Sequence, residues 1–306
     1  MTVLAALVLT SVAPLAAPQA EAAPAPTIDE ILVITREPRY VARTQRDRIG
    51  RIWAPVFLNG KGPFRLVLDT GANRSAVIQS VVDVLGEEVL TDKTARLRGV
   101  TGTSMVPLIQ VNRMSVGDLI LEPAQLPIVL DVFGGADGVL GNEGLLDKRI
   151  HIDFKYDRIT VRRSRREPAG PGFRATPIRM MRENLLAIDI RIGRVLTRAI
   201  IDTGAPDSLG NLALLRALKR DARENQSTEI IGVTLDVEPG MRVPMPVMRV
   251  EGVDIRNAVL TFGDVDIFRY WRMTDEPVLM LGMDVLGVLD EIVIDYMTRE
   301  LHLKTG

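Results

Sequence analysis

Two copies of one short motif carry the residues of this chain that are best suited to chemistry. The stretch DTGANRS at residues 69–75 returns as DTGAPDS at residues 202–208. The shared positions are Asp69, Thr70, Gly71, Ala72 and Ser75 in the first copy and Asp202, Thr203, Gly204, Ala205 and Ser208 in the second. Two carboxyl groups that meet share one proton, because neighbouring like charges cannot both ionise. The motif therefore predicts acid–base chemistry.

The residues that follow each acid fit a tight loop between two equivalent units. Thr70 offers a hydroxyl that can hydrogen-bond backbone across a symmetric interface, and Gly71 removes the side chain where another backbone or a substrate approaches closely. Thr203 and Gly204 repeat this pair. A lone Asp in such a loop would more simply make an Asx turn, but that interpretation does not explain two matched copies.

Apolar runs rich in branched residues come directly before both acids. Residues 64–68 and 199–201 therefore predict strands that end at the two acids. Apolar residues at helical spacing then predict a short covering helix at residues 76–85, and residues 209–219 predict a second one. Each half of the chain is thus expected to deliver one carboxylate at the end of a strand.

Glycine-containing segments downstream of the helices predict two hairpins with mobile tips. The tips are Gly99, Val100 and Thr101 in the first half and Gly232, Val233 and Thr234 in the second. The two tips are 133 residues apart, which is also the separation of the two acids. Residues 281–286 correspond to residues 140–145, and each segment follows the hairpin of its own half. A repeat this long indicates duplication of a whole domain.

Composition narrows the possible chemistry. The chain has 306 residues and 46% hydrophobic content, which is sufficient for two packed domains. It has no cysteine, so disulfides, thiolate nucleophiles and cysteine zinc sites are excluded. The two histidines, His151 and His302, lie in apolar alternating segments that favour a packing role. We expect no metal and no cofactor, and a net charge of -1 predicts no general attraction to nucleic acid.

The first residues are expected to target the chain rather than to fold with it. Residues 3–17 are apolar but interrupted by Pro14, and Ala20 and Ala22 form a small-x-small cleavage pattern. We predict a signal peptide at residues 1–22, a periplasmic or secreted protein, and no integral membrane span. No Lys or Arg precedes the apolar core, so an uncleaved anchor, a different start and a disordered leader stay open as alternatives.

The rest of the chain divides into four segments: an N-terminal extension at residues 23–49, a first lobe at 50–164, a linker at 165–172 and a second lobe at 173–306. Four arginines lie close to the boundary: Arg162, Arg163, Arg165 and Arg166. A solvent-exposed linker is favoured over a nucleic-acid or lipid patch, because no aromatic or further basic residues extend the cluster into a binding face.

Taken together, these features give each half a resemblance to a retropepsin-like aspartic peptidase domain, and the pair resembles the fused, two-lobed bacterial form. The resemblance rests on both DTGAxxS motifs and on the Val-Leu-Gly and Met-Leu-Gly segments at residues 139–141 and 280–282, and it covers about residues 50–304. It implies a mainly β fold with two homologous lobes, each with a short covering helix.

The resemblance also implies roles for the repeated residues. Asp69 and Asp202 would hold the attacking water, Thr70 and Thr203 would lock the two loops together, and the glycine hairpins would be flaps that bind substrate. In the implied mechanism, one carboxylate acts as base on the water while the other donates a proton to the scissile carbonyl. Because both acids lie in one chain, the catalytic unit is expected to be a monomer.

Two functions follow from this scaffold. The first is an exported aspartic endopeptidase that cuts an extended polypeptide. The second is a non-hydrolytic peptide-binding or interaction module that keeps the duplicated fold. Intact Asp-Thr-Gly in both halves favours the enzyme, since a binding module has no need of paired buried acids.

An aromatic segment of the second half has no equivalent in the first. Its members, between the second glycine hairpin and the Met-Leu-Gly segment, are Phe262, Phe268, Tyr270 and Trp271. They predict either an apolar substrate pocket or packing in the core and over the lobe interface, and both alternatives stay open.

Overall fold

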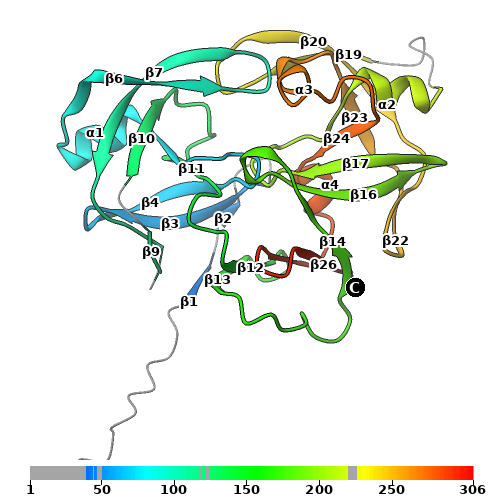
Figure 1. Ribbon diagram of the computed structural model, residues 1–306, viewed down its shortest axis with the longest axis horizontal. Helices are drawn as coiled ribbons and strands as arrows, with labels where there is room; N and C mark the ends of the chain where they lie inside the picture. The colour runs from blue at the N-terminus through cyan, green and yellow to red at the C-terminus, as the bar shows by residue number, and fades with distance from the viewer. Residues whose placement is uncertain are drawn as a thin grey trace, which may run out of the picture. The chain divides into compact units, whose positions relative to one another are not determined.

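The computed structural model describes residues 39–43, 45–46, 50–116, 119–121, 124–219 and 226–305. The predicted signal peptide lies outside the described residues, as does most of the predicted N-terminal extension. The described part of the chain from residue 39 onward is mainly β and contains three sheets with a few short helices (Figure 1). The predicted fold class is therefore confirmed.

Two ten-stranded sheets repeat one plan. The first contains β2 (Gln45–Arg46), β3 (Ile52–Leu58), β4 (Lys61–Leu68), β5 (Ala76–Ile78), β6 (Val89–Arg98), β7 (Thr103–Val111), β8 (Met114–Val116), β9 (Leu119–Leu121), β10 (Ala124–Val129) and β11 (Gly138–Leu140). The second contains β15 (Arg179–Met180), β16 (Leu186–Ile192), β17 (Val195–Ile201), β18 (Leu209–Gly210), β19 (Gln226–Ile231), β20 (Val237–Pro244), β21 (Met248–Val250), β22 (Val253–Ile255), β23 (Val259–Phe262) and β24 (Val278–Leu281). The strand order β6-β7-β10-β5-β11-β4-β3-β8-β9 matches β19-β20-β23-β18-β24-β17-β16-β21-β22 position by position. The duplication seen in the sequence is thus a duplication of topology.

The strands that precede the two acids lie at equivalent places in their sheets. β4 pairs in parallel with β11, with Leu68 opposite Leu140, and β17 pairs in parallel with β24, with Ile201 opposite Leu281. These strands are buried on both faces near their ends, as their continuous apolar runs predict. Each acid therefore follows a strand that is fixed from both sides.

The covering helices are shorter than the sequence indicates. Their bounds are Gln79–Leu85 for α1 and Leu212–Ala217 for α2. Residues 76–78 and 209–210 form the short strands β5 and β18 instead of a first helical turn, because they pair with strands on both sides. The other helices of the described residues are η1 (Arg182–Asn184), α3 (Asp266–Tyr270) and α4 (Met283–Leu286).

A third sheet of six strands joins the two halves. Its order is β1 (Arg39–Arg43), β13 (Arg158–Arg163), β12 (Lys148–Asp153), β25 (Glu291–Asp295), β26 (Glu300–Lys304) and β14 (Arg174–Pro177). β12 of the first half pairs with β25 of the second half, so the last hairpin of each half contributes to one shared sheet. Arg162 and Arg163 belong to strand β13 and not to a linker. The lobe boundaries at residues 164 and 173 stay a prediction.

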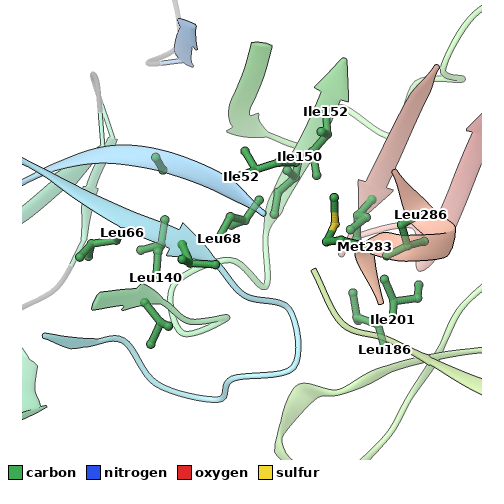
Figure 2. Close-up of a cluster of buried hydrophobic side chains, with 14 of the residues drawn as sticks. Ile52, Leu66, Leu68, Leu140, Ile150, Ile152, Leu186, Ile201, Met283 and Leu286 are labelled. Carbon is green, nitrogen blue, oxygen red and sulfur yellow. The ribbon is translucent and has the colours of Figure 1, made fainter. Parts of the chain in front are cut away.

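One hydrophobic cluster runs through both ten-stranded sheets and the shared sheet. Figure 2 shows its central part, with residues from both halves: Ile52, Leu66, Leu68, Leu140, Ile150, Ile152, Leu186, Ile201, Met283 and Leu286. Residues 37–306 accordingly form one compact unit. The strand ends that carry the acids are therefore anchored in a common core.

A buried ion pair lies where the two halves meet in the shared sheet. Arg149 on β12 donates to Asp295 on β25 at 2.9 Å, and the side chains are 4% and 0% exposed. Asp295 also accepts from the Ser164 hydroxyl at 2.7 Å and from the Thr298 amide at 3.1 Å. Burial alone would raise the pKa of Asp295, but these donors lower it below its usual value. The carboxylate therefore stays charged and depends on its partners.

We predict that Arg149→Met destabilises the protein by about 3–5 kcal/mol, because it leaves a buried carboxylate without its charged partner. The measurement is the free energy of unfolding in urea. The control is Arg179→Met, which breaks the exposed Arg179–Asp189 pair and should cost less than about 1 kcal/mol. Equal losses in the two variants would contradict the importance of the buried pair.

Candidate active site

Asp69 and Asp202 lie against each other in the structure. Asp69 follows β4, Asp202 follows β17, and their carboxyl groups are in hydrogen-bond contact. Each carboxyl also covers the glycine of the opposite loop. A Cβ on Gly71 would lie 2.6 Å from Asp202 Cγ, and a Cβ on Gly204 would lie 2.2 Å from Asp69 Cγ. Both loops therefore need glycine, because any side chain there would displace the opposite acid.

Thr70 and Thr203 make four hydrogen bonds between a hydroxyl and the backbone of the opposite half. The Thr70 hydroxyl donates to Ile201 O at 2.8 Å and accepts from the Thr203 amide at 3.1 Å. The Thr203 hydroxyl donates to Leu68 O at 2.7 Å and accepts from the Thr70 amide at 3.1 Å. Both threonines are fully buried. The cross-bonds hold the two strand ends in a fixed relation.

Each acid is also held by its own loop. The Gly71 and Ala72 amides donate to Asp69 Oδ1 at 2.8 and 2.9 Å. The Gly204 and Ala205 amides donate to Asp202 Oδ1 at 3.0 and 2.9 Å. Since one oxygen of each carboxyl accepts two amides, the orientation of both groups is set before any ligand arrives.

The raised pKa values of the two acids indicate that they share one proton. Burial, followed by the charge of Asp202, raises the pKa of Asp69 to about 8, although the loop amides act in the opposite direction. Burial also raises the pKa of Asp202, and its loop amides again oppose the shift. One proton is therefore retained by the pair well above the pH at which an isolated Asp ionises.

Two acids that we did not single out from the sequence hydrogen-bond to the serines of the two loops. Glu143 accepts from the Ser75 amide at 2.5 Å, and Asp284 accepts from the Ser208 hydroxyl at 2.6 Å and from the Ser208 amide at 3.0 Å. Burial raises the pKa of both acids. A signal was present in the sequence, because the repeated serines and residues 140–145 and 281–286 place a hydroxyl and an acid at matching positions in both halves.

A buried phenol is a second feature absent from the sequence prediction. Tyr296 follows β25 and is 2% exposed, and its hydroxyl has no hydrogen-bond partner among the described residues. Burial, followed by the charge of Asp69, raises its pKa. The phenol therefore stays neutral near the acid pair.

The six predicted flap residues come together where the tips of the β6–β7 and β19–β20 hairpins meet. The Gly232 amide donates to the Thr101 hydroxyl at 3.1 Å. A Cβ on Gly99 would lie 3.0 Å from Val233 Cγ1 and 3.4 Å from Thr234 Oγ1. A Cβ on Gly232 would lie 3.2 Å from the Val100 amide nitrogen. The role of these tips toward a substrate stays a prediction.

The aromatic segment of the second half serves packing more than it forms a pocket. Phe262 and Phe268 are 0% and 1% exposed and belong to the two hydrophobic clusters of the protein. Tyr270 and Trp271 lie at the end of α3, with Trp271 packed against the second cluster. Within the described ranges, we find no group of three acidic or histidine side chains placed to hold a metal ion, and no helix long and apolar enough to cross a membrane.

Comparison with known proteins finds one matching family model and distant structural neighbours. Residues 54–143 match the family model described as aspartyl protease. Among solved structures, basic 7S globulin from soybean is 11% identical and aligns over 89% of this chain and 96% of its own, with a TM-score of 0.47. A retropepsin-like aspartic protease from Rickettsia conorii is 19% identical and aligns over 44% of this chain and 91% of its own, with a TM-score of 0.34. No curated protein matches the sequence.

We predict that Thr203→Val destabilises the protein by about 2–4 kcal/mol, because Leu68 O and the Thr70 amide would each lose a buried partner. The matched control is Thr197→Val. Thr197 is equally buried, but its hydroxyl makes only a 3.5 Å contact within its own strand, so its loss should cost less than about 1 kcal/mol. Urea unfolding of both variants distinguishes the two cases.

Proposed function

We propose that this chain, which has an aspartyl protease fold and resembles the retropepsin-like aspartic peptidases, is an endopeptidase that uses Asp69 and Asp202 to activate water. One observation carries the proposal. Two carboxyl groups from topologically equivalent loops lie in hydrogen-bond contact, and the pKa of Asp69 is raised to about 8. Contact between like charges in a buried place is unfavourable, and it is typical of a site that must share and move a proton.

The geometry fits a mechanism of general acid–base catalysis. A water bound between the two carboxyls loses a proton to the ionised member and attacks the peptide carbonyl carbon. The protonated member donates its proton to the carbonyl oxygen, which gives a neutral tetrahedral intermediate. The intermediate then collapses: one of its hydroxyls returns a proton to the ionised carboxyl as the C=O bond re-forms, the C–N bond breaks, and the protonated carboxyl gives its proton to the leaving amine. The pair begins and ends with one proton.

The loops supply the orientation that this mechanism needs. Asp69 Oδ1 and Asp202 Oδ1 are each occupied by two loop amides, so the second oxygen of each carboxyl is left for the water and the shared proton. Fixed groups need no rearrangement as charge moves during the reaction. An extended polypeptide that pairs with strand edges near the flap tips would place its backbone across the pair.

We predict that Asp69→Asn and Asp202→Asn each reduce peptide hydrolysis at least about a hundredfold while the fold is retained, because an amide cannot pass the proton between water and carbonyl. Cleavage of a peptide library measures the loss. Asp207→Asn is the control, since Asp207 is an exposed acid beside the second loop.

A mixture of the two inactive variants should stay inactive, because both acids of one site come from one chain. Turnover by either single variant would refute the dyad, and a non-hydrolytic binding module would show binding without cleavage in the wild type.

We also predict activity that extends to neutral pH. The state with one proton on the pair is lost as the pH rises through the upper pKa, and this pKa is raised to about 8 at Asp69. Ala72 and Ala205 donate only through their amides. Ala72→Ser or Ala205→Ser would add a hydroxyl donor that stabilises the ionised form, so the upper limb of the pH–rate profile should move to lower pH. An unchanged or alkaline-shifted limb in both variants would contradict this account.

A further inference from the structure

The flap of the first half does not stand free in the structure. Its tip packs against the second hydrophobic cluster, which belongs to the second half, through the side chain of Val100. The Val100 carbonyl accepts a hydrogen bond of 3.1 Å from the amide of Ile267, the second residue of α3. Figure 1 shows α3 beside the tip of the β6–β7 hairpin. Flap 1, residues 98–103, is therefore bound to an element of the opposite lobe.

A charged contact strengthens this attachment. Arg98, at the end of β6, forms an ion pair of 2.7 Å with Asp266, the first residue of α3. The side chains are only 25% and 30% exposed, so solvent screens the pair less than a surface pair. The Arg98 guanidinium also lies 4.0 Å over the ring of Tyr270, at the last turn of the same helix. The Tyr270 hydroxyl in turn donates to Glu183.

The attachment is one-sided. α3 lies in the connection between β23 and β24, at residues 263–277, whereas the equivalent connection between β10 and β11 is shorter and contains no helix. The second flap, residues 231–237, contacts the tip of flap 1 directly through Gly232 and Val233. Its Ile231, Leu235 and Val237 are more than half exposed.

We propose that α3 is a latch that holds flap 1 closed over the acid pair, and that release of the Arg98–Asp266 contact admits the polypeptide. The proposal rests on the proposed endopeptidase function for its role, but the latch itself is a physical contact that can be measured without activity. Flap 1 must separate from α3 before a chain can pass between them, since Val100 and Arg98 now occupy that surface. The unlatched state is the binding-competent one, and its fractional population reduces the apparent affinity for substrate.

The test compares Asp266→Ala with Asp264→Ala. Asp264 lies two residues earlier and pairs with Arg269 of its own segment rather than with the flap. Hydrogen exchange of the amides at residues 98–103 and of Ile267 reports on the latch. We expect Asp266→Ala to accelerate this exchange about tenfold, as loss of a charged hydrogen bond implies, and Asp264→Ala to leave it unchanged. Tyr270→Leu should accelerate it as well, and circular dichroism confirms that each variant is folded.

The same variants separate the latch from the enzymatic function. If the latch limits entry, Asp266→Ala raises kcat/KM for a long polypeptide substrate. Unchanged exchange in both Asp266→Ala and Tyr270→Leu overturns the latch, whatever the activity. If hydrogen exchange at flap 1 becomes faster but kcat/KM does not rise, the latch does not control entry of the polypeptide. If the wild type hydrolyses no peptide, the proposed function fails, and the exchange rates still decide whether α3 holds the flap.

Discussion

The structure depends on holding two carboxyl groups in contact with each other. Desolvation and mutual repulsion both oppose this arrangement. The loop amides and the crossed hydrogen bonds of Thr70 and Thr203 offset them, and each crossed bond needs a partner from the other loop. The crossed bonds therefore form only when the two halves are correctly placed. The rest of the fold has to keep two strand ends at a fixed separation.

The shared sheet and the common core meet that requirement. β12 and β25 pair across the two halves, and the cluster around Ile150 and Ile294 continues into the strands that end at the acids. A displacement of one half against the other would break main-chain pairing, buried packing and the Arg149–Asp295 ion pair together. The interface between the two halves therefore holds the acid pair in place as much as the loops do.

Much of the fold and of the acid pair could be predicted from the sequence, because the motifs are short and each occurs in both halves. The strands that end at the two acids and the two glycine hairpins follow from apolar runs, glycines and matched spacing. The sequence could not show that residues 76–78 and 209–210 pair as strands, since burial and partners decide between a strand and a helical turn in so short a run. Glu143 and Asp284 were missed for a related reason. An acid in the sequence can be predicted to hold a loop in place only when the serine that it hydrogen-bonds is known to lie beside it.

The contacts around the two acids are the same in both halves, whereas the contacts of the two flaps differ. This difference has a physical reason. The acid pair needs two loops that approach alike, so the same amide, threonine and serine contacts occur on both sides. No such constraint acts on the flaps. In a symmetric dimer of identical chains, an insertion like α3 would occur twice and bind both flaps. A fused chain carries it once, so Arg98 and Val100 bind to it while the second flap keeps its exposed apolar residues. A single chain with two unequal halves thus allows the two flaps to be attached differently above an acid pair that remains symmetric.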